Sequence, residues 1–200
     1  GVGGFRLGLE RSGWKTLFAN QWEPATKVQH AAECYLSHFP EEANNPYFNQ
    51  DINIVTSLLE KDENVIPDHT LLVGGFPCQD YSVATTKAKG MLGKKGVLWW
   101  EIEKIVRHKH PPFVLLENVD RLLVSPAKQR GRDMGILLSC FRDLGYSVEW
   151  RVINAADYGL PQKRRRVFIF AFRDDTKVAK RLKKAGLTHS WLQKDGFFAS

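Results

Sequence analysis

The residues best suited to covalent chemistry lie in residues 74–79, Gly-Gly-Phe-Pro-Cys-Gln, where Cys78 directly follows a proline. The apolar run at residues 70–73 predicts a buried strand, and the two glycines with φ-locked Pro77 end that strand abruptly. A side chain held just beyond the end of a strand lies where reacting groups lie in open α/β folds. A cysteine is more often a small buried hydrophobe. This placement instead favours a positioned nucleophile at Cys78.

Composition restricts the class of protein. With 200 residues, of which 43% are apolar, the chain can bury one sizeable core, so we expect one domain or a little more. Three widely spaced cysteines argue against a disulfide framework, and no apolar run approaches membrane-spanning length. The N-terminus shows no signal-peptide pattern, so we expect a soluble cytoplasmic protein. The net charge of +7 favours a polyanionic partner, although basic proteins without one are common.

The apolar patterns predict strands that alternate with helices. Strands are expected at residues 15–20, 71–74, 113–116, 147–153 and 167–172, and helices at 5–11, 24–38, 98–108 and 134–144. This order predicts an α/β fold whose mostly parallel sheet is covered on both faces. Because no helix separates residues 147–153 from 167–172, these two strands should form an antiparallel pair at one edge. The lysine-rich stretch after Arg173 predicts a surface helix with a solvated face.

The start of the chain has features of a nucleotide-type site. Residues 1–4, Gly-Val-Gly-Gly, precede a helical pattern, and glycines at a helix N-terminus let a ligand approach the backbone. A frayed chain end is an equally common explanation of such glycines. Gln21, Trp22 and Glu23 end the next expected strand about 20 residues on, where a ribose-binding side chain is expected. Trp22 could stack on an adenine or pack in the core.

Six segments together resemble the DNA (cytosine-5) methyltransferase family in identity, order and spacing over nearly the whole chain. Three of them concern the cofactor: residues 1–5 resemble the end of the first cofactor motif, Asp51-Ile52 is similar to the adenine-binding pair, and residues 96–101 are similar to a segment that places a leucine on the cofactor. The other three concern the reaction: residues 74–82 are similar to the nucleophile motif, residues 117–119 are the Glu-Asn-Val triplet, and residues 162–166 are the Gln-x-Arg-x-Arg motif. Any one match is weak, whereas the ordered set is specific.

The resemblance implies a Rossmann-like S-adenosylmethionine-dependent methyltransferase of the restriction-modification kind, which modifies double-stranded DNA. We expect it to be monomeric and to bind no metal. It assigns catalysis to Cys78, Glu117, Arg164 and Arg166. The implied cofactor-binding residues are Gly1, Val2, Gly3, Gly4, Gln21, Trp22, Glu23, Asp51, Ile52, Pro77 and Leu98. The implied DNA-binding residues are Gln79, Ser82, Lys87, Lys89 and Gln162.

The implied reaction explains these residue types. Carbon 5 of cytosine is a poor nucleophile, so a thiolate must first add to carbon 6. Lowering a cysteine pKa from about 8.5 to about 7 requires roughly 2 kcal/mol, and an arginine about 4 Å away could supply roughly 4 kcal/mol. Arg164 and Arg166 should share one face of an expected edge strand, with Arg165 pointing away. Glu117 could hydrogen-bond ring nitrogen 3. The basic, glycine-containing residues 79–95 could close behind a base rotated out of the duplex.

Two alternatives stay open. One is a transfer-RNA cytosine-5 methyltransferase, since members that share these motifs can act on RNA. The other is a non-catalytic DNA-binding regulatory partner, against which the joint presence of Cys78, Glu117 and Arg166 argues. The chain departs from the family pattern at Gln21, where a glutamate is usual, so Glu23 could substitute for it. We expect residues 1–175 to form a catalytic domain without its first strand, and residues 176–200 to lead toward an absent target-recognition domain.

Two further features are expected to be structural. His30, Cys34 and His38 follow one helix face but diverge over about 12 Å, too far for one metal ion. Cys140 lies in an apolar helical pattern and should pack in the core.

Overall fold

A computed structural model describes residues 2–23, 26–61, 63–76, 98–125, 129–186 and 194–199. The chain divides into two compact units, Gly1–His69 and Thr70–Ser200. Each unit has its own hydrophobic cluster and is described by itself.

Among its described residues, the first unit has three short helices and one 3-10 helix, with a small aromatic cluster on α2. These are α1 (Gly4–Arg11), α2 (His30–His38), η1 (Pro40–Asn44) and α3 (Ile52–Leu59). Tyr35 packs on Phe39 and Phe48 with ring centroids 4.8 and 5.2 Å away. These rings form the aromatic cluster of the unit, and Val55 and Leu59 of α3 are also buried.

Two predictions for the first unit need correction. Residues 15–20 form no strand, because no described strand of this unit pairs with them. Side chains hold this segment instead: the Asn20 amide donates to the Tyr47 and Gln50 carbonyls at 2.8 and 2.9 Å. The helix predicted at residues 24–38 begins only at His30. The Gln29 side chain bonds the Glu23 backbone and so closes a loop before the helix.

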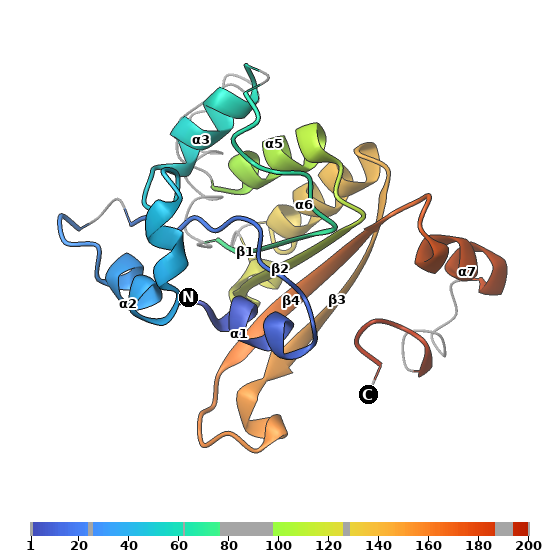
Figure 1. The fold of residues 1–200 in the computed structure, drawn as a ribbon. Helices are drawn as coiled ribbons and strands as arrows, with labels where there is room; N and C mark the ends of the chain where they lie inside the picture. The colour runs from blue at the N-terminus through green and yellow to red at the C-terminus, as the bar shows by residue number, and fades with distance from the viewer. Residues whose placement is uncertain are drawn as a thin grey trace. The chain divides into compact units, whose positions relative to one another are not determined.

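The second unit is built on a four-stranded sheet in the order β1-β2-β4-β3 (Figure 1). The strands are β1 (Leu71–Gly75), β2 (Phe113–Val119), β3 (Tyr146–Asn154) and β4 (Arg165–Arg173). The α/β class and the antiparallel pair of β3 with β4 are confirmed. Only β1 with β2 is parallel, since β4 also runs antiparallel to β2. Strand β4 is thus interior and β3 is at the edge, so the expected edge position of the arginine strand is wrong.

The register brings the carboxyl ends of β1, β2 and β3 to the same side of the sheet as the start of β4. Gly75 lies opposite Glu117, Val119 lies opposite Arg166, and Asn154 lies opposite Arg165. The ends of β1 and β2 therefore meet the start of β4. We call this side, formed by Gly75, residues 117–119 and residues 165–166, the carboxyl edge.

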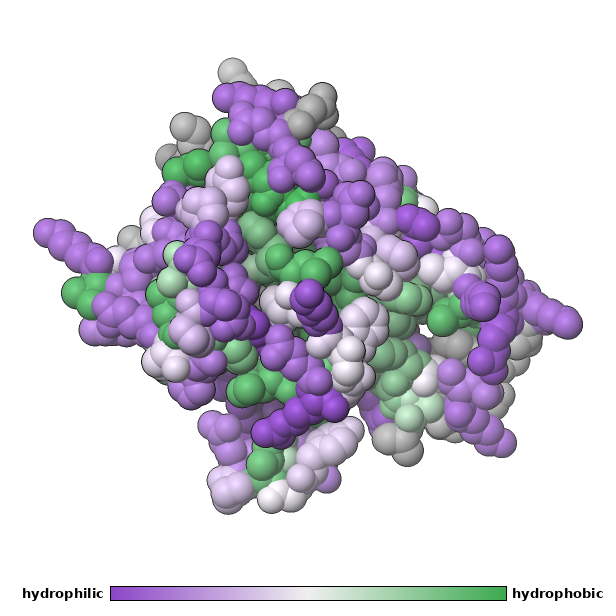
Figure 2. Space-filling model, viewed as in Figure 1, coloured by the Kyte–Doolittle hydropathy of each residue, from purple (hydrophilic) through white to green (hydrophobic). Residues whose placement is uncertain are grey.

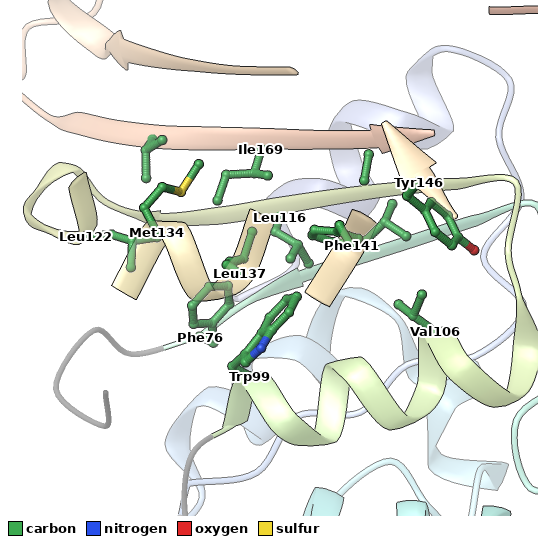
Figure 3. Close-up of a cluster of buried hydrophobic side chains, with 13 residues drawn as sticks. Phe76, Trp99, Val106, Leu116, Leu122, Met134, Leu137, Phe141, Tyr146 and Ile169 are labelled. Carbon is green, nitrogen blue, oxygen red and sulfur yellow. The ribbon is translucent and has the colours of Figure 1, made fainter. Parts of the chain in front are cut away.

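Two amphipathic helices cover one face of the sheet, α5 (Leu98–Lys109) and α6 (Arg132–Asp143). Figure 3 shows their side chains meeting those of the strands in one buried cluster. We call this cluster, which includes Trp99, Leu116, Leu137 and Ile169, the main core. Trp99 packs edge-on against Phe141, with ring centroids 5.3 Å apart. A turn at Gly145, with φ 78°, follows α6, as the sequence predicted. These contacts fix the helices that flank the carboxyl edge.

The opposite face is covered by α7 (Lys177–Ala185), whose Ala179 and Leu182 pack on Phe170 and Phe172 of β4. The basic surface helix predicted after Arg173 is therefore present. Phe197, near the end of the chain, stacks on Phe170 with centroids 3.8 Å apart. The sheet is thus covered on both faces, as expected.

The residues set aside in the sequence have ordinary environments. His30, Cys34 and His38 are exposed on α2, and within the described ranges no group of side chains could hold a metal ion. Cys140 is half-buried against the main core, and its burial raises the pKa of its thiol. No described helix is long and apolar enough to cross a membrane.

Candidate active site

Glu117 and Arg166 form an ion pair at the carboxyl edge. The Arg166 Nε donates to the Glu117 Oε1 at 2.8 Å, and both side chains are about a quarter exposed. The pair joins two adjacent strands, because Glu117 lies on β2 and Arg166 on β4. The Arg166 Nη1 also donates to the Arg165 carbonyl at 2.8 Å. A carboxylate and a guanidinium are therefore held together where a substrate in solvent can reach them.

Gly75 leaves the space that the Glu117 carboxylate occupies. A Cβ at position 75 would lie 3.3 Å from the Glu117 Oε2, closer than most real contacts of that kind. The sequence suggested only that this glycine helps to end the strand. The structure shows that it also lets the carboxylate lie across the end of β1.

Asn118 fixes the chain just before the segment that carries Cys78. Its side chain is 1% exposed, and its Nδ2 donates to the Phe76 carbonyl at 2.8 Å. The Asn118 Oδ1 accepts from the Val119 backbone N–H at 2.8 Å. Phe76 is itself buried against Trp99. Sequence reasoning gave Asn118 no role, although a polar residue at the end of an apolar strand was the available signal.

Residues 77–97 lie outside the described residues. The predictions that fall on this segment concern Pro77, Cys78, Gln79, Ser82, Lys87 and Lys89.

The other arginines of the motif are placed differently from Arg166. Arg164 is exposed and precedes β4, where its carbonyl accepts from the Ala155 N–H at 3.0 Å. Arg165 pairs with Asp120 at 3.1 Å. Gln162 is exposed in the loop before β4. Among the described residues, only Arg166 of this motif contacts Glu117.

Gly3 is required by the packing of the first unit itself, so the predicted approach of a cofactor to these glycines stays a prediction. Gly3 adopts φ 83° at the N-terminus of α1, and a Cβ there would lie 2.9 Å from the Phe39 ring. Both facts require glycine at this position. Val2 is exposed beside it, Gly4 begins α1, and Gly1 lies outside the described residues.

The remaining cofactor candidates of the first unit lie in two segments. Trp22 is 36% exposed, so its ring is accessible to a ligand. Its neighbour Gln21 donates its backbone N–H to the Phe48 carbonyl at 2.7 Å, while the Glu23 backbone bonds Gln29. Asp51 caps α3, accepting from the Asn53 N–H at 3.0 Å, and Ile52 begins that helix.

Leu98 belongs to the second unit. It begins α5 and packs partly against the main core.

Arg6 joins three carboxylates of the first unit, and its side chain is only 9% exposed. The sequence analysis gave this residue no role. Its guanidinium donates to Glu10 at 2.8 Å and to Glu42 at 2.9 Å, also bonds Glu41, and lies 4.0 Å from the Phe39 ring centroid. Burial lowers the pKa of Arg6, but hydrogen bonds to Tyr35 and Glu10 more than offset this, so the pKa lies above its ordinary value. Arg6 thereby ties α1 to η1 beside Gly3.

Replacing Arg6 with methionine should destabilise the protein by about 2 to 3 kcal/mol, because buried Glu42 would lose its cationic partner. The change can be measured as the free energy of unfolding in urea. Arg11→Met, on an exposed position of the same helix, is the control and should stay within about 0.5 kcal/mol. Equal losses of unfolding free energy in the two variants would contradict the stabilising role of the Arg6 ion pairs.

Solved structures resemble this arrangement of strands and helices. The S. pombe Dnmt2 methyltransferase matches with a TM-score of 0.60 at 16% identity, covering 100% of this chain and 54% of that one. The Spodoptera frugiperda DNMT2 mutant matches with a TM-score of 0.59 at 15% identity, covering 88% and 49%. At this identity the likeness shows the fold alone, and it is the α/β fold of these two proteins.

Sequence comparison gives the family. The family described as C-5 cytosine-specific DNA methylase matches residues 1–195. The Type II methyltransferase M.Sau3AI of Staphylococcus aureus is 48% identical over 204 residues, covering 100% of this chain and 48% of the relative. The Type II methyltransferase M.HhaI of Haemophilus parahaemolyticus is 34% identical over 178 residues, covering 89% and 48%. The chain belongs to the C-5 cytosine-specific DNA methylase family and spans about half the length of these relatives.

Proposed function

We propose that this protein transfers a methyl group from S-adenosylmethionine to carbon 5 of cytosine in double-stranded DNA. The Glu117–Arg166 pair carries the proposal, because it places an acid and a cation together at the carboxyl edge. Cys78 is two residues from Phe76, so covalent geometry limits the distance between their Cα atoms to roughly 7 Å. Asn118, next to Glu117, anchors Phe76. Acid and cation thus lie at one end of the sheet, and the chain that leads to Cys78 leaves β1 at that same end.

The chain's own residues would share the work on the base. Cys78 as a thiolate adds to carbon 6 of a cytosine rotated out of the duplex, and Glu117 hydrogen-bonds ring nitrogen 3 as electron density moves toward carbon 5. The Arg166 guanidinium has further N–H donors for the cytosine oxygen while it orients Glu117. After methyl transfer, water takes the carbon 5 proton, the electron pair of that C–H bond re-forms the 5,6 double bond, and the C–S pair leaves with sulfur, so that the ring and the Cys78 thiolate are restored.

The first unit carries the residues that we assign to the cofactor. Trp22 offers an accessible ring, and Asp51 orders the start of α3. S-adenosylmethionine, when bound, supplies the electrophilic methyl group. Gly4, where an added Cβ would meet no other atom, would let it approach the backbone, and Trp22 would stack on its adenine.

Methyl transfer tests this proposal directly. The protein, S-adenosylmethionine with a labelled methyl group and mixed-sequence duplex DNA should yield labelled 5-methyldeoxycytidine after digestion to nucleosides. A parallel reaction with transfer RNA tests the RNA alternative, and label found only in RNA would replace DNA as the substrate. Binding of DNA without any labelled nucleoside would favour the regulatory alternative. Relatives named Type II methyltransferases support DNA and a role beside restriction.

Trp22→Ala should weaken cofactor binding by about 1 to 3 kcal/mol, if stacking on nucleic-acid bases is a fair guide. Isothermal calorimetry with S-adenosylmethionine measures the loss. Trp14→Ala is the matched control, because Trp14 is an equally exposed tryptophan of the same unit. Unchanged affinity in Trp22→Ala, with folding intact, would exclude stacking.

A further inference from the structure

The loop between β3 and β4 extends past the carboxyl edge and exposes two large apolar side chains. Tyr158 is 61% exposed and Leu160 is 58% exposed. In Figure 1 this orange loop projects beyond the ends of the strands, and in Figure 2 it carries apolar residues among hydrophilic ones. We call Tyr158, Gly159 and Leu160 the loop tip. Single exposed apolar side chains are common, but two of them on one short turn at the carboxyl edge form a small apolar surface next to the Glu117–Arg166 pair.

The loop tip is held in place by the backbone around it. Asn154 begins the 3-10 helix η4 (Ala155–Tyr158), and its Nδ2 donates to the Asp157 Oδ1 at 3.1 Å. The Leu160 N–H donates to the Ala155 carbonyl at 3.3 Å. Gly159 adopts φ 78° with open space around it, so glycine serves the turn there and relieves no contact. An ordered loop therefore presents the two apolar side chains outward.

Cations follow the loop tip along the chain. Lys163 and Arg164 are both exposed, and no described acidic group pairs with either. The next residues enter β4, where Arg166 holds Glu117. An aromatic ring beside unpaired cations is the composition of surfaces that bind unstacked nucleic acid, where bases meet the ring and phosphates meet the cations. Unstacked DNA offers both apolar base faces and negatively charged phosphates, so it fits this loop better than a protein segment does.

We propose that the loop tip contacts the base faces exposed when the target cytosine leaves the helix, while Lys163 and Arg164 bind the adjoining phosphates. This rests on the proposed function, since extrusion of one base uncovers the faces of its neighbours. The Tyr158 ring and the Leu160 side chain replace part of the lost stacking. The loop tip thereby offsets part of the cost of extrusion.

Binding to two duplexes of the same sequence tests the proposal. One duplex is fully paired, and the other carries an abasic site opposite the target cytosine, which removes the pairing that opposes extrusion. Fluorescence anisotropy should show that the parent protein prefers the second duplex. Tyr158→Ala should lose about tenfold in affinity for the second duplex and little for the first. Tyr158→Phe should keep the preference, because the ring face makes the contact.

Two further variants separate the aromatic contact from charge and folding. Lys163→Gln should weaken both duplexes alike and reduce the salt slope by about one. Trp150→Ala removes an exposed aromatic of β3, away from the loop, and should leave both affinities unchanged. Circular dichroism verifies that each variant is folded.

The outcomes distinguish this inference from the function on which it rests. A parent that binds both duplexes equally would overturn base extrusion and the loop contact together. A parent that prefers the abasic duplex, with Tyr158→Ala keeping that preference, would overturn only the loop contact. Equal losses in Tyr158→Ala and Trp150→Ala would also overturn it.

Discussion

Cys78→Ser is expected to reduce methyl transfer by roughly a thousandfold or more while leaving S-adenosylmethionine binding nearly unchanged. A thiolate is accessible near neutral pH, whereas a serine alkoxide is not, so the serine variant cannot add to carbon 6 of the ring. The side chains differ by one atom, so folding and cofactor contacts should be preserved. Methylation rates and calorimetry on the same preparation measure the two quantities separately.

A duplex with 5-fluorocytosine at the target position identifies the attacking residue. Fluorine at carbon 5 replaces the proton that must leave, so the covalent adduct persists and mass spectrometry of its peptides locates it. The chain supplies its own controls: Cys34 is exposed on α2, and Cys140 is half-buried on α6. Serine variants at these two positions should still form the adduct. A peptide modified at Cys34 or Cys140 in the parent protein would contradict the assignment to Cys78.

The strands of the second unit were predictable because each is a short apolar run with a clear boundary. Residues 71–74 and 113–116 were expected as strands and lie within β1 and β2. The parallel direction of these two strands follows from the intervening helix α5. Glu117 directly follows the second apolar run, so the same two signals put it at the edge that also receives the end of β1. Local pattern and chain direction were sufficient for that residue.

The neighbour of each strand could not be predicted from the same signals. Strand β4 is apolar on both faces, which suits an interior strand, yet its arginines suggested an edge. Pairing with β2 makes β4 an interior strand, and this pairing depends on contacts between residues about fifty positions apart. That pairing places Arg166 against Glu117, and no hydrophobic periodicity of the sequence indicates this contact.

The first unit was predicted less well, since its structure depends on side-chain contacts between distant residues. Residues 15–20 have the composition of a strand but no partner strand, and Asn20 bonds Tyr47 and Gln50 instead. Arg6 meets Glu41 and Glu42 across thirty-five and thirty-six positions. Neither contact follows from helix or strand periodicity. The sequence marked Gly3 only as a place for a ligand to approach, whereas the positive φ and the close Phe39 ring that require a glycine there are visible only in the structure.

Glu117→Gln is expected to lower the rate of methyl transfer about 10²- to 10⁴-fold, the range that a general acid contributes. Glutamine keeps the shape and an oxygen acceptor for Arg166, but it removes the charge and has no carboxyl proton to share with ring nitrogen 3. The ion pair is partly exposed, so its loss should cost stability no more than about 1 kcal/mol. The fall in activity should therefore far exceed any fall in the free energy of unfolding.

Asp120→Asn is the matched control for this variant. Asp120 is also a carboxylate near the carboxyl edge and also pairs with an arginine, Arg165, at 3.1 Å. The substitution removes the same charge from the same region, yet Asp120 has no place in the proposed chemistry. Single-turnover methylation of a pre-formed complex with duplex DNA should show a normal rate for Asp120→Asn and a slow one for Glu117→Gln. If both variants slow the reaction equally, the charge of the edge matters and Glu117 has no special part in it. If Glu117→Gln reacts at the parent rate, ring nitrogen 3 is activated by another group, and the role of the Glu117–Arg166 pair is structural.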